Sequence, residues 1–365
     1  MPTVINSIQR CVQQSHASVV HLFAPNKLTA ETTYGGNSTC IQVSPRLIDH
    51  LRHFFNAPGS TMGFTDHNQA QAVQIAAHGK DSLLLVTATG SGKTLPGFMA
   101  SRYFDLSTAV TVYIVPYNAM HGQYLKRLEE AGLSHSTWHQ GITPENAPQN
   151  IIVTCDSSIM SPFVDFIREL TACKRLARVI FDEAHLIIRQ DNFRPVMQKL
   201  RFLSQIGVQI ILLTATLPVA LQPKLLEYVG LTAPIVLRGS TPRPNISYRI
   251  LRVKDAGEVI PKVAQVFSSL KNAPDTKRIL IFCSTINQTQ LLARKLDIEP
   301  CFAGLGSPAI EDLLSRFRRG EIQALATTCV LGVGLHVSGV THVIHAGNPR
   351  DIIEFAQDTG RAGRD

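Results

Sequence analysis

Short runs of aliphatic and β-branched residues recur along the chain, and each is followed by a longer amphipathic stretch. Eight such runs are present: 83-LLLV-86, 111-TVYIV-115, 151-IIVT-154, 179-VIF-181, 209-QIILL-213, 279-ILIF-282, 322-IQALA-326 and 342-HVIH-345. Continuous apolar strands that alternate with helical segments are typical of parallel sheets covered by helices on both faces. The pattern therefore predicts an α/β fold, and eight strands are many for a single sheet.

The segment 238-RGSTPRPNIS-247 interrupts this pattern between the fifth run and the sixth, because it holds two prolines and shows no helical period. The chain of 365 residues also exceeds the roughly 250–300 residues at which single cores stop growing. We therefore predict two domains, residues 61–239 and 240–365, with a boundary near 239–245. Residues 1–60 show no clear strand or helix period and are predicted to form a loosely ordered extension.

The composition narrows the function classes. The seven cysteines occur singly, without a C-x-x-C pair, so we expect no zinc and no disulfide framework, and a reducing intracellular compartment fits best. No apolar run approaches the ~18 residues of a membrane span, and the N-terminus lacks the pattern of a secretory signal, so no membrane partner is expected. The formal net charge of +8 is compatible with a polyanionic partner.

A glycine-rich turn, 87-TATGSGKT-94, follows the first apolar run and opens a predicted helix. In such a turn, backbone N–H groups face a triphosphate, the Lys93 ammonium reaches the β- and γ-phosphates, and the Thr94 hydroxyl can ligate Mg²⁺. Thr87 stands where the P-loop pattern has its first glycine, but the N–H donors come from later residues. The turn predicts ATP and Mg²⁺ as cofactors, bound by Thr89, Gly90, Ser91, Gly92, Lys93 and Thr94.

Two adjacent carboxylates end another apolar run, in 179-VIFDEAH-185. Asp182 would hold the Mg²⁺ through water, and Glu183 is placed to polarise the attacking water as a general base. The two carboxylates would repel each other without a cation nearby. The pair therefore supports the metal and nucleotide site that the P-loop predicts.

These motifs resemble those of the superfamily 2 helicases. The resemblance rests on TGSGKT, 182-DEAH-185 and 214-TATLP-218, which are similar to motifs I, II and III, and on 278-RILIFCST-285, 325-LATTCVLGVGLHVSGVTHVIH-345 and 357-QDTGRAGR-364, which are similar to motifs IV, V and VI. It implies two tandem RecA-like P-loop NTPase domains, each a mostly parallel sheet flanked by helices. Such domains clamp ATP and a nucleic-acid strand between them.

Three short stretches resemble the RecQ-type DNA helicases rather than the RNA-directed families: 193-FRP-195, 243-RPNI-246 and the ending GRAGRD. This resemblance implies an ATP-dependent 3′ to 5′ DNA helicase or single-strand translocase, intracellular and nuclear in a eukaryote, with DNA as its partner. The chain departs from the RecQ pattern after DEAH, where 186-LIIRQDN-192 lacks the aromatic-rich stretch. The zinc-binding and winged-helix domains that often follow motif VI are predicted to be absent.

The resemblance also implies roles for individual residues. Gln69 aligns with an adenine-reading glutamine, with Gln71 as a possible substitute, and His185 resembles the link between the nucleotide site and motif III. Gln357, Arg361 and Arg364 would act on the γ-phosphate bound by the other domain, and the arginine spacing of three puts both on one side if the segment is helical. The expected catalytic set is Lys93, Asp182, Glu183, His185, Gln357, Arg361 and Arg364. Residues expected to bind nucleic acid or to couple it to ATP are Arg194, Thr214, Thr216 and Thr327.

Two alternative functions remain open at this point. The first is an RNA-directed superfamily 2 ATPase. The second is a nucleotide- or DNA-binding remnant without unwinding activity, suggested by the degenerate stretch 186–192. Trp138, the single tryptophan, is expected to serve local packing, with base stacking as the alternative.

Overall fold

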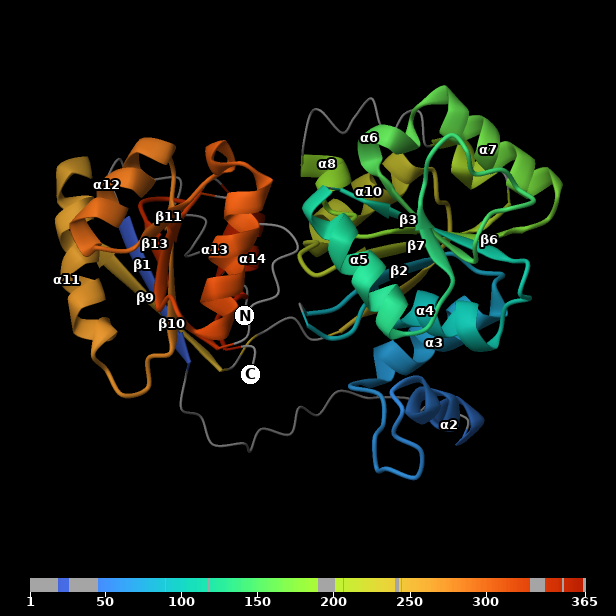
Figure 1. Cartoon of the computed structure of the whole chain (residues 1–365), viewed down its shortest axis with the longest axis horizontal. Helices are drawn as coiled ribbons and strands as arrows, with labels where there is room; N and C mark the ends of the chain where they lie inside the picture. Colours follow the sequence, from blue (N-terminus) through green and yellow to red (C-terminus); the bar gives the residue numbers. More distant parts are fainter. Residues whose placement is uncertain are drawn as a thin grey trace. The chain divides into compact units, whose positions relative to one another are not determined.

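The computed structural model describes residues 19–25, 45–88, 90–116, 118–189, 201–205, 207–239, 243, 245–328, 339–349 and 351–363. The chain divides into two compact units, which we describe separately (Figure 1). The first unit comprises Tyr34–Thr241, and the second comprises Pro242–Asp365 together with Met1–Thr33. The division between Thr241 and Pro242 falls inside the proline-containing segment where the sequence predicted a boundary.

The first unit is built on a seven-stranded sheet in which every pair of neighbours is parallel. In spatial order its strands are β4 (His135–Thr137), β5 (Asn150–Thr154), β3 (Val110–Val115), β6 (Leu176–Phe181), β7 (Gln209–Thr214), β2 (Leu83–Val86) and β8 (Ile235–Arg238). Every residue of β2, β3 and β7 is buried, as expected for strands covered on both faces. The five strands predicted before residue 239 are confirmed.

Helices cover both faces of this sheet. They are α2 (Pro45–Phe54), α3 (His67–His78), α4 (Leu95–Tyr103), α5 (Asn118–Glu130), α6 (Cys155–Ser158), α7 (Ser161–Ala172), α8 (Leu186–Arg189) and α10 (Gln222–Val229). The largest core cluster joins alternate strand residues to α7 and α10, through side chains such as Phe163 and Leu225. On α4, a Cβ at Gly97 would lie 2.4 Å from Cδ1 of Ile180, so glycine lets this helix pack closely on β6.

The second unit holds a six-stranded sheet with one antiparallel insertion. In spatial order its strands are β11 (Glu299–Cys301), β12 (Ala324–Thr327), β10 (Arg278–Cys283), β13 (Val340–Ala346), β1 (Val19–Pro25) and β9 (Ile246–Arg252). The first four are parallel, and β1 runs antiparallel to both β13 and β9. The three strands predicted after residue 239 are among them.

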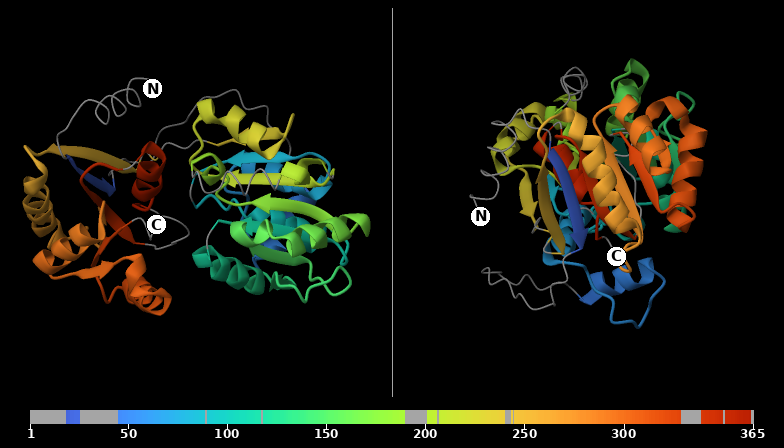
Figure 2. Two further views of the ribbon diagram at one scale, coloured as in Figure 1. Left: turned by 90° about the horizontal axis from the view of Figure 1, so that it is seen from above. Right: turned by 90° about the vertical axis from the view of Figure 1, so that its left-hand side faces the viewer.

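Among the described residues, four helices cover the two faces of the second sheet (Figures 1 and 2). They are α11 (Val259–Lys271), α12 (Ile286–Leu296), α13 (Ser307–Arg319) and α14 (Ile352–Thr359). Alternation along β10 assigns the faces: Ile279 and Ile281 share a core cluster with α11 and α12, whereas Leu280 and Phe282 share one with α13 and α14. Two units with mostly parallel sheets and helices on both faces confirm the α/β prediction.

The prediction of a loosely ordered extension over residues 1–60 is wrong for two segments. Val19–Pro25 forms β1, which lies between β13 and β9 (blue in Figure 1). Pro45–Phe54 forms α2, whose Leu47 and Leu51 pack in a cluster with α3 and α4. The pairing of β1 with strands more than two hundred residues away leaves no local period to detect, so sequence pattern alone missed it.

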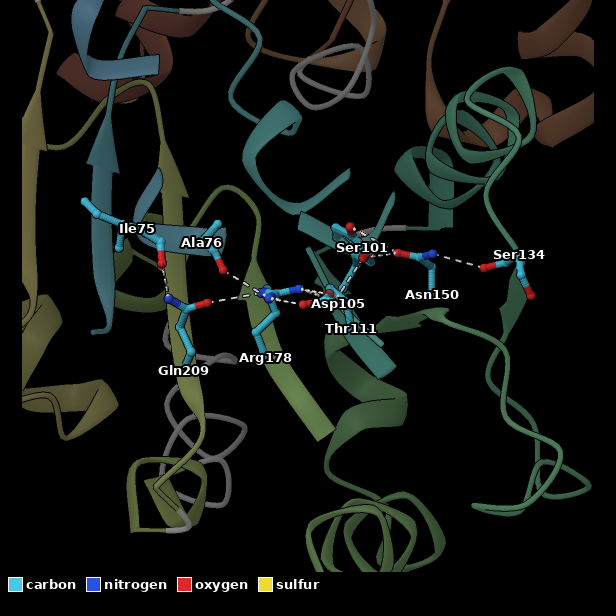
Figure 3. Close-up of polar contacts among 10 residues, drawn as sticks. Ile75, Ala76, Ser101, Asp105, Thr111, Ser134, Asn150, Arg178 and Gln209 are labelled. Atoms are coloured by element: carbon cyan, nitrogen blue, oxygen red, sulfur yellow. Dashed lines mark hydrogen bonds and ion pairs between the residues drawn. The ribbon is translucent and has the colours of Figure 1, made fainter. Parts of the chain in front are cut away.

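A buried polar network lies near the amino ends of four neighbouring strands of the first unit (Figure 3). Its members on these strands are Thr111, Asn150, Arg178 and Gln209. Arg178 is 1 % exposed and forms an ion pair with Asp105, which follows α4. The network ties β3, β5, β6 and β7 to α3 and α4 at the edge of the sheet opposite to the P-loop.

Candidate nucleotide site

Three segments meet where β2, β6 and β7 end. The Thr87 N–H donates to the Thr214 carbonyl at 3.2 Å, and the Ala184 N–H donates to the Leu213 carbonyl at 2.9 Å. These bonds bring together the glycine-rich turn after β2, the DEAH segment after β6 and the TAT segment at the end of β7. In parallel sheets, ligands bind at the carboxyl ends of the strands, so this edge is the candidate site.

The glycine-rich turn has the backbone that a phosphate-binding loop needs. Gly90 and Gly92 have φ angles of +88° and +75°, values that glycine adopts at little cost. The Ser91 hydroxyl donates to the Thr87 hydroxyl at 2.8 Å, which closes the turn. Helix α4 starts directly afterwards at Leu95, so the positive end of its helix dipole favours an anion at this place. Thr89 lies outside the described residues.

Gln69 contacts this turn from helix α3. Its side-chain carbonyl accepts from the Thr65 N–H at 2.9 Å, and its amide donates to the Ser91 carbonyl at 2.9 Å. A Cβ at Gly92 would lie 2.4 Å from this amide nitrogen, so glycine at 92 is what permits the contact. For Gln71 the described structure records no such bond. The two contacts favour Gln69 over Gln71, and its reading of adenine stays a prediction.

Asp182 is the half-buried carboxylate that directly follows β6. Its Oδ1 accepts from the Glu183 N–H at 2.8 Å and its Oδ2 accepts from the Tyr124 hydroxyl at 2.7 Å. Burial raises the pKa of Asp182, and the Glu183 carboxylate raises it further, whereas the Lys93 ammonium lowers it. Lys93 is therefore close enough to act on this carboxylate.

The residues present fit a divalent cation. A buried carboxylate beside a second one is stabilised when a cation offsets their repulsion, and hard cations prefer such oxygen ligands. Thr94 is the residue before α4 and makes no side-chain capping bond, so its hydroxyl is not committed to the helix. Asp182 and Thr94 could hold Mg²⁺.

Tyr124 is a residue of the site that the sequence did not single out. It lies on α5, is 2 % exposed, and packs against Phe98 and Tyr113. Burial raises the pKa of its hydroxyl well above the ordinary value, so this group stays a donor to Asp182. A buried tyrosine hydroxyl needs a partner, and a tyrosine among the apolar positions of an amphipathic helix was the only signal available.

His185 connects the second carboxylate to the end of β7. Its Nδ1 lies 2.9 Å from the Thr214 hydroxyl and 3.3 Å from Glu183 Oε2. The Thr216 N–H donates to the same Thr214 hydroxyl at 3.3 Å. These are the contacts that the predicted link between DEAH and TAT requires, and its role in coupling stays a prediction.

The second unit holds the residues expected to act from the other side of the nucleotide. Gln357 lies on α14, which ends at Thr359. Arg361 follows the helix and is 4 % exposed. The spacing of three was expected to place Arg361 and Arg364 on one side only if their segment is helical. That condition is not met, because the helix ends before Arg361. Arg364 lies outside the described residues, and the action of these groups on a γ-phosphate stays a prediction.

Arg243 and Asn245 anchor the motif VI segment. The Arg243 guanidinium donates to the carbonyls of Gly360 and Ala362 at 3.2 and 2.9 Å, and also to that of Gly363. The Asn245 amide donates to the Gly363 carbonyl at 2.7 Å. Gly363 has a φ of +59°, and a Cβ there would lie 2.7 Å from the Asn245 amide nitrogen. The stretch 243-RPNI-246 was recognised in the sequence, but this contact was not predicted.

Two remaining predictions receive limited support. The Thr327 hydroxyl is fully buried and donates to the Thr328 carbonyl at 2.8 Å, so a direct contact of this group with nucleic acid is not supported, and a coupling role stays a prediction. Arg194 lies outside the described residues.

Among the described residues, no cluster of three or more His, Cys, Asp or Glu is arranged to hold a metal, and no helix is long and apolar enough to cross a bilayer.

Comparison with known proteins agrees with this geometry. Residues 66–223 match the family model of the DEAD/DEAH box helicases, and residues 261–365 match that of the helicase conserved C-terminal domain. The ATP-dependent DNA helicase RecQ of Pasteurella multocida is 28 % identical over 81 % of this chain and 48 % of its own length. The chain is a helicase chain that holds a DEAD/DEAH box helicase domain followed by a helicase conserved C-terminal domain. It is similar to RecQ and spans about half the length of this bacterial relative.

Solved structures show the same fold at lower identity. The DUF1998 helicase MrfA bound to DNA superposes with a TM-score of 0.72 at 17 % identity, covering 99 % of this chain and 54 % of that one. Saccharomyces cerevisiae Dbp5 bound to RNA and ADP BeF3 superposes with a TM-score of 0.64 at 16 % identity, covering 88 % and 85 %. The chain has the fold of two tandem RecA-like domains.

Proposed function

We propose that the chain is an ATP-dependent 3′ to 5′ DNA helicase or single-strand DNA translocase that hydrolyses ATP between its two RecA-like domains. One observation carries the proposal: the glycine-rich turn, the DEAH carboxylates and the TAT segment converge at the carboxyl ends of β2, β6 and β7. The relative named as a DNA helicase favours DNA as the substrate. The proposal includes an intracellular localisation, which would be nuclear in a eukaryote.

The residues of the first unit would bind and activate the nucleotide. The turn at 90–94 would hold the phosphates, with Lys93 on the β- and γ-phosphates. Asp182 and Thr94 would hold Mg²⁺, which neutralises charge on the phosphates when it is bound. Glu183 would accept a proton from the attacking water, and His185 would link its position to Thr214. Arg361 would stabilise charge on the γ-phosphate from the second unit, with Gln357 and Arg364.

Two alternatives stay testable. The RNA-directed ATPase is kept because Dbp5, solved bound to RNA, shares the fold. The remnant without unwinding activity is kept because 186–192 lacks aromatic residues, and base stacking on aromatic side chains contributes about 1–3 kcal/mol per base.

Strand displacement is the decisive experiment. We expect ATP-dependent separation of a duplex with a 3′ single-stranded tail, none with a 5′ tail, and none with Lys93→Ala. ATP hydrolysis should be stimulated more by single-stranded DNA than by RNA of the same length. Equal or greater stimulation by RNA would favour the RNA-directed alternative, and nucleotide binding without DNA-stimulated turnover would favour the remnant.

The Tyr124→Phe variant is expected to weaken the predicted metal site by about 10–100-fold, the usual effect of removing a hydrogen bond to a metal ligand. The aromatic packing on α5 is kept, and only the donor to Asp182 is lost. The measurements are the Mg²⁺ concentration for half-maximal ATP hydrolysis and the Mg²⁺-dependent affinity for a fluorescent nucleotide. Tyr228→Phe, on α10, is the matched control. An unchanged Mg²⁺ dependence would show that the hydroxyl does not orient Asp182.

The Arg243→Ala variant is expected to lower the turnover number about 10–100-fold without changing the affinity for nucleotide. The change removes the guanidinium donor of three carbonyls of the motif VI segment, and the Gly363 carbonyl keeps its bond from the Asn245 amide. A buried group left unpaired costs about 1–3 kcal/mol. Arg243→Lys should rescue only part, because an ammonium lacks the planar fork. Arg249→Ala, an exposed arginine on β9, is the control. A turnover number equal to that of the control would mean that motif VI is positioned without Arg243.

A further inference from the structure

The last residue of β8, Arg238, connects the edge of the first sheet to the segment that follows TAT. Its Nη1 donates to the Leu217 carbonyl at 2.9 Å, and its Nε and Nη2 each donate to the side-chain carbonyl of Gln222 at 3.1 Å. Strand β2 lies between β8 and β7 in the sheet, and Leu217 follows β7. The guanidinium therefore reaches past β2 to a segment that leaves the sheet on its other side.

These bonds give the segment after β7 a fixed position. Arg238 is half-buried and burial lowers its pKa, and the acceptors recorded for it among the described residues are neutral oxygens. Hydrogen bonds from a charged donor are roughly twice as strong as neutral ones, and the planar guanidinium fork fixes their direction. Gln222 is the first residue of α10, so the contact holds both the Leu217 backbone and the start of that helix.

The held segment is connected to the DEAH carboxylates through Thr214. The Thr216 N–H donates to the Thr214 hydroxyl at 3.3 Å, and the same hydroxyl lies 2.9 Å from His185 Nδ1. That nitrogen lies 3.3 Å from Glu183 Oε2. Because Leu217 directly follows Thr216, a shift of the Leu217 backbone would displace the Thr216 N–H and change a contact of the Thr214 hydroxyl.

The residue after Arg238 contacts the phosphate turn. The Gly239 N–H donates to the Val86 carbonyl at 2.8 Å, and a Cβ at Gly239 would lie 3.1 Å from Thr87 Cγ2. The Thr87 N–H in turn donates to the Thr214 carbonyl at 3.2 Å. The end of β8 therefore contacts the start of the phosphate turn as well as the segment after TAT.

We propose that Arg238 is a positioning residue for ATP hydrolysis, and this rests on the proposed function. It holds residues 215–222 in the arrangement that keeps the Thr214 hydroxyl at His185. None of its recorded bonds goes to Lys93, Thr94 or Asp182, so its loss should leave nucleotide and Mg²⁺ binding intact. The rate of hydrolysis should fall, because the neighbours of Glu183 lose their fixed geometry.

The Arg238→Ala variant should lower the turnover number with saturating single-stranded DNA by about 10–100-fold, the effect of a small misplacement caused from outside the reacting groups. The affinity for a fluorescent nucleotide with Mg²⁺ should be unchanged. Arg238→Lys should restore part of the turnover, because an ammonium can donate to the same oxygens without the planar fork. Arg46→Ala, which removes an exposed arginine on α2, is the control.

Hydrogen exchange measures the position of the segment without reference to activity. The backbone amides of residues 215–222 should exchange faster in Arg238→Ala than in the control. Gln222→Ala keeps Arg238 and removes two of its three bonds, so it should change exchange and turnover in the same directions by smaller factors. This variant decides the question even if Arg238→Ala does not fold.

A double-variant cycle with Thr214→Val tests the route of the effect. If Arg238 acts through the Thr214 hydroxyl, the double variant should turn over about as slowly as the slower single variant. A double loss equal to the product of the single losses would overturn the role of Arg238. Turnover or exchange equal to that of the control, or nucleotide affinity falling in step with turnover, would also overturn it and leave the proposed function standing. Absence of ATP hydrolysis in the unaltered protein would overturn both.

Discussion

Replacing Glu183 by glutamine is expected to lower the rate of ATP hydrolysis by about 10²–10⁴-fold, the contribution of a positioned general base. The amide has nearly the same shape as the carboxylate but cannot accept the proton of the attacking water. In the unaltered protein, Glu183 Oε2 lies 3.3 Å from His185 Nδ1, and the same nitrogen lies 2.9 Å from the Thr214 hydroxyl. Geometry is kept, and only the proton acceptor is lost.

The affinity for Mg²⁺ and nucleotide should be unchanged or tighter in this variant. The Glu183 carboxylate is one of the groups that raise the pKa of Asp182, so its removal makes the ionised Asp182 easier to form. The sign follows from charge: one negative neighbour fewer favours the negative form of a carboxylate. A turnover number that falls while nucleotide affinity holds is the signature of a lost base rather than of a lost binding site.

The measurements are the turnover number with saturating single-stranded DNA and the affinity for a fluorescent nucleotide. Glu227→Gln is the matched control, because it makes the same change at an exposed position on α10. If Glu183→Gln hydrolysed ATP as fast as this control, the base would have to be another group, and the assignment of Glu183 would be wrong.

The local pattern predicted the strands that are buried on both faces and missed those that are not. Strand β7 is buried throughout, and its central run of Ile and Leu stood out in the sequence. Strand β9 instead carries exposed Tyr248 and Ile250 in an edge position. Strand β1 is defined by pairing with β13 and β9. Register with partners so far along the chain depends on tertiary packing, which a local period does not contain.

The candidate site was predictable where a motif carries chemistry of its own. The glycine-rich turn and the DEAH carboxylates have types and spacings that follow from phosphate and metal binding, and the structure brings them together. Tyr124 and Arg243 were missed for a physical reason, because each donates a hydrogen bond to a group far along the chain. The acceptor is 58 positions away for Tyr124 and at least 117 positions away for Arg243. Such a bond is decided by the fold and leaves no spacing to recognise.

The Asp105→Ala variant is expected to destabilise the first unit by about 3–5 kcal/mol, the usual cost of leaving one partner of a buried ion pair unpaired. Arg178 donates to both carboxylate oxygens of Asp105, and its other donors reach the Thr111 hydroxyl, the Gln209 side chain and the Ala76 carbonyl (Figure 3). Asp105 is the only anion among these partners. Its removal leaves a cation that is 1 % exposed with neutral acceptors alone.

Thermal unfolding should register this loss as a fall in the midpoint of about 6–20 °C, at roughly 2–4 °C per kcal/mol for a unit of this size. Arg168→Ala is the control, because Arg168 pairs with Asp165 on α7 with side chains 63 % and 60 % exposed. An exposed pair of this kind contributes about 0–1 kcal/mol. A midpoint for Asp105→Ala within the range of this control would mean that the neutral acceptors suffice for Arg178.

The double variant Asp105→Leu with Arg178→Met separates charge pairing from packing. Replacing both partners by apolar side chains removes the unpaired charge, so it should cost less than the sum of the single changes. Arg178 and Gln209 lie toward the amino ends of their strands, whereas Asp182 and Thr214 lie at the carboxyl ends. We therefore expect Asp105→Ala, Arg168→Ala and the double variant to hydrolyse ATP at the unaltered rate at temperatures well below the unfolding midpoint. A loss of turnover in a folded single variant would instead connect this network to the nucleotide site, along β6 from Arg178 to Asp182.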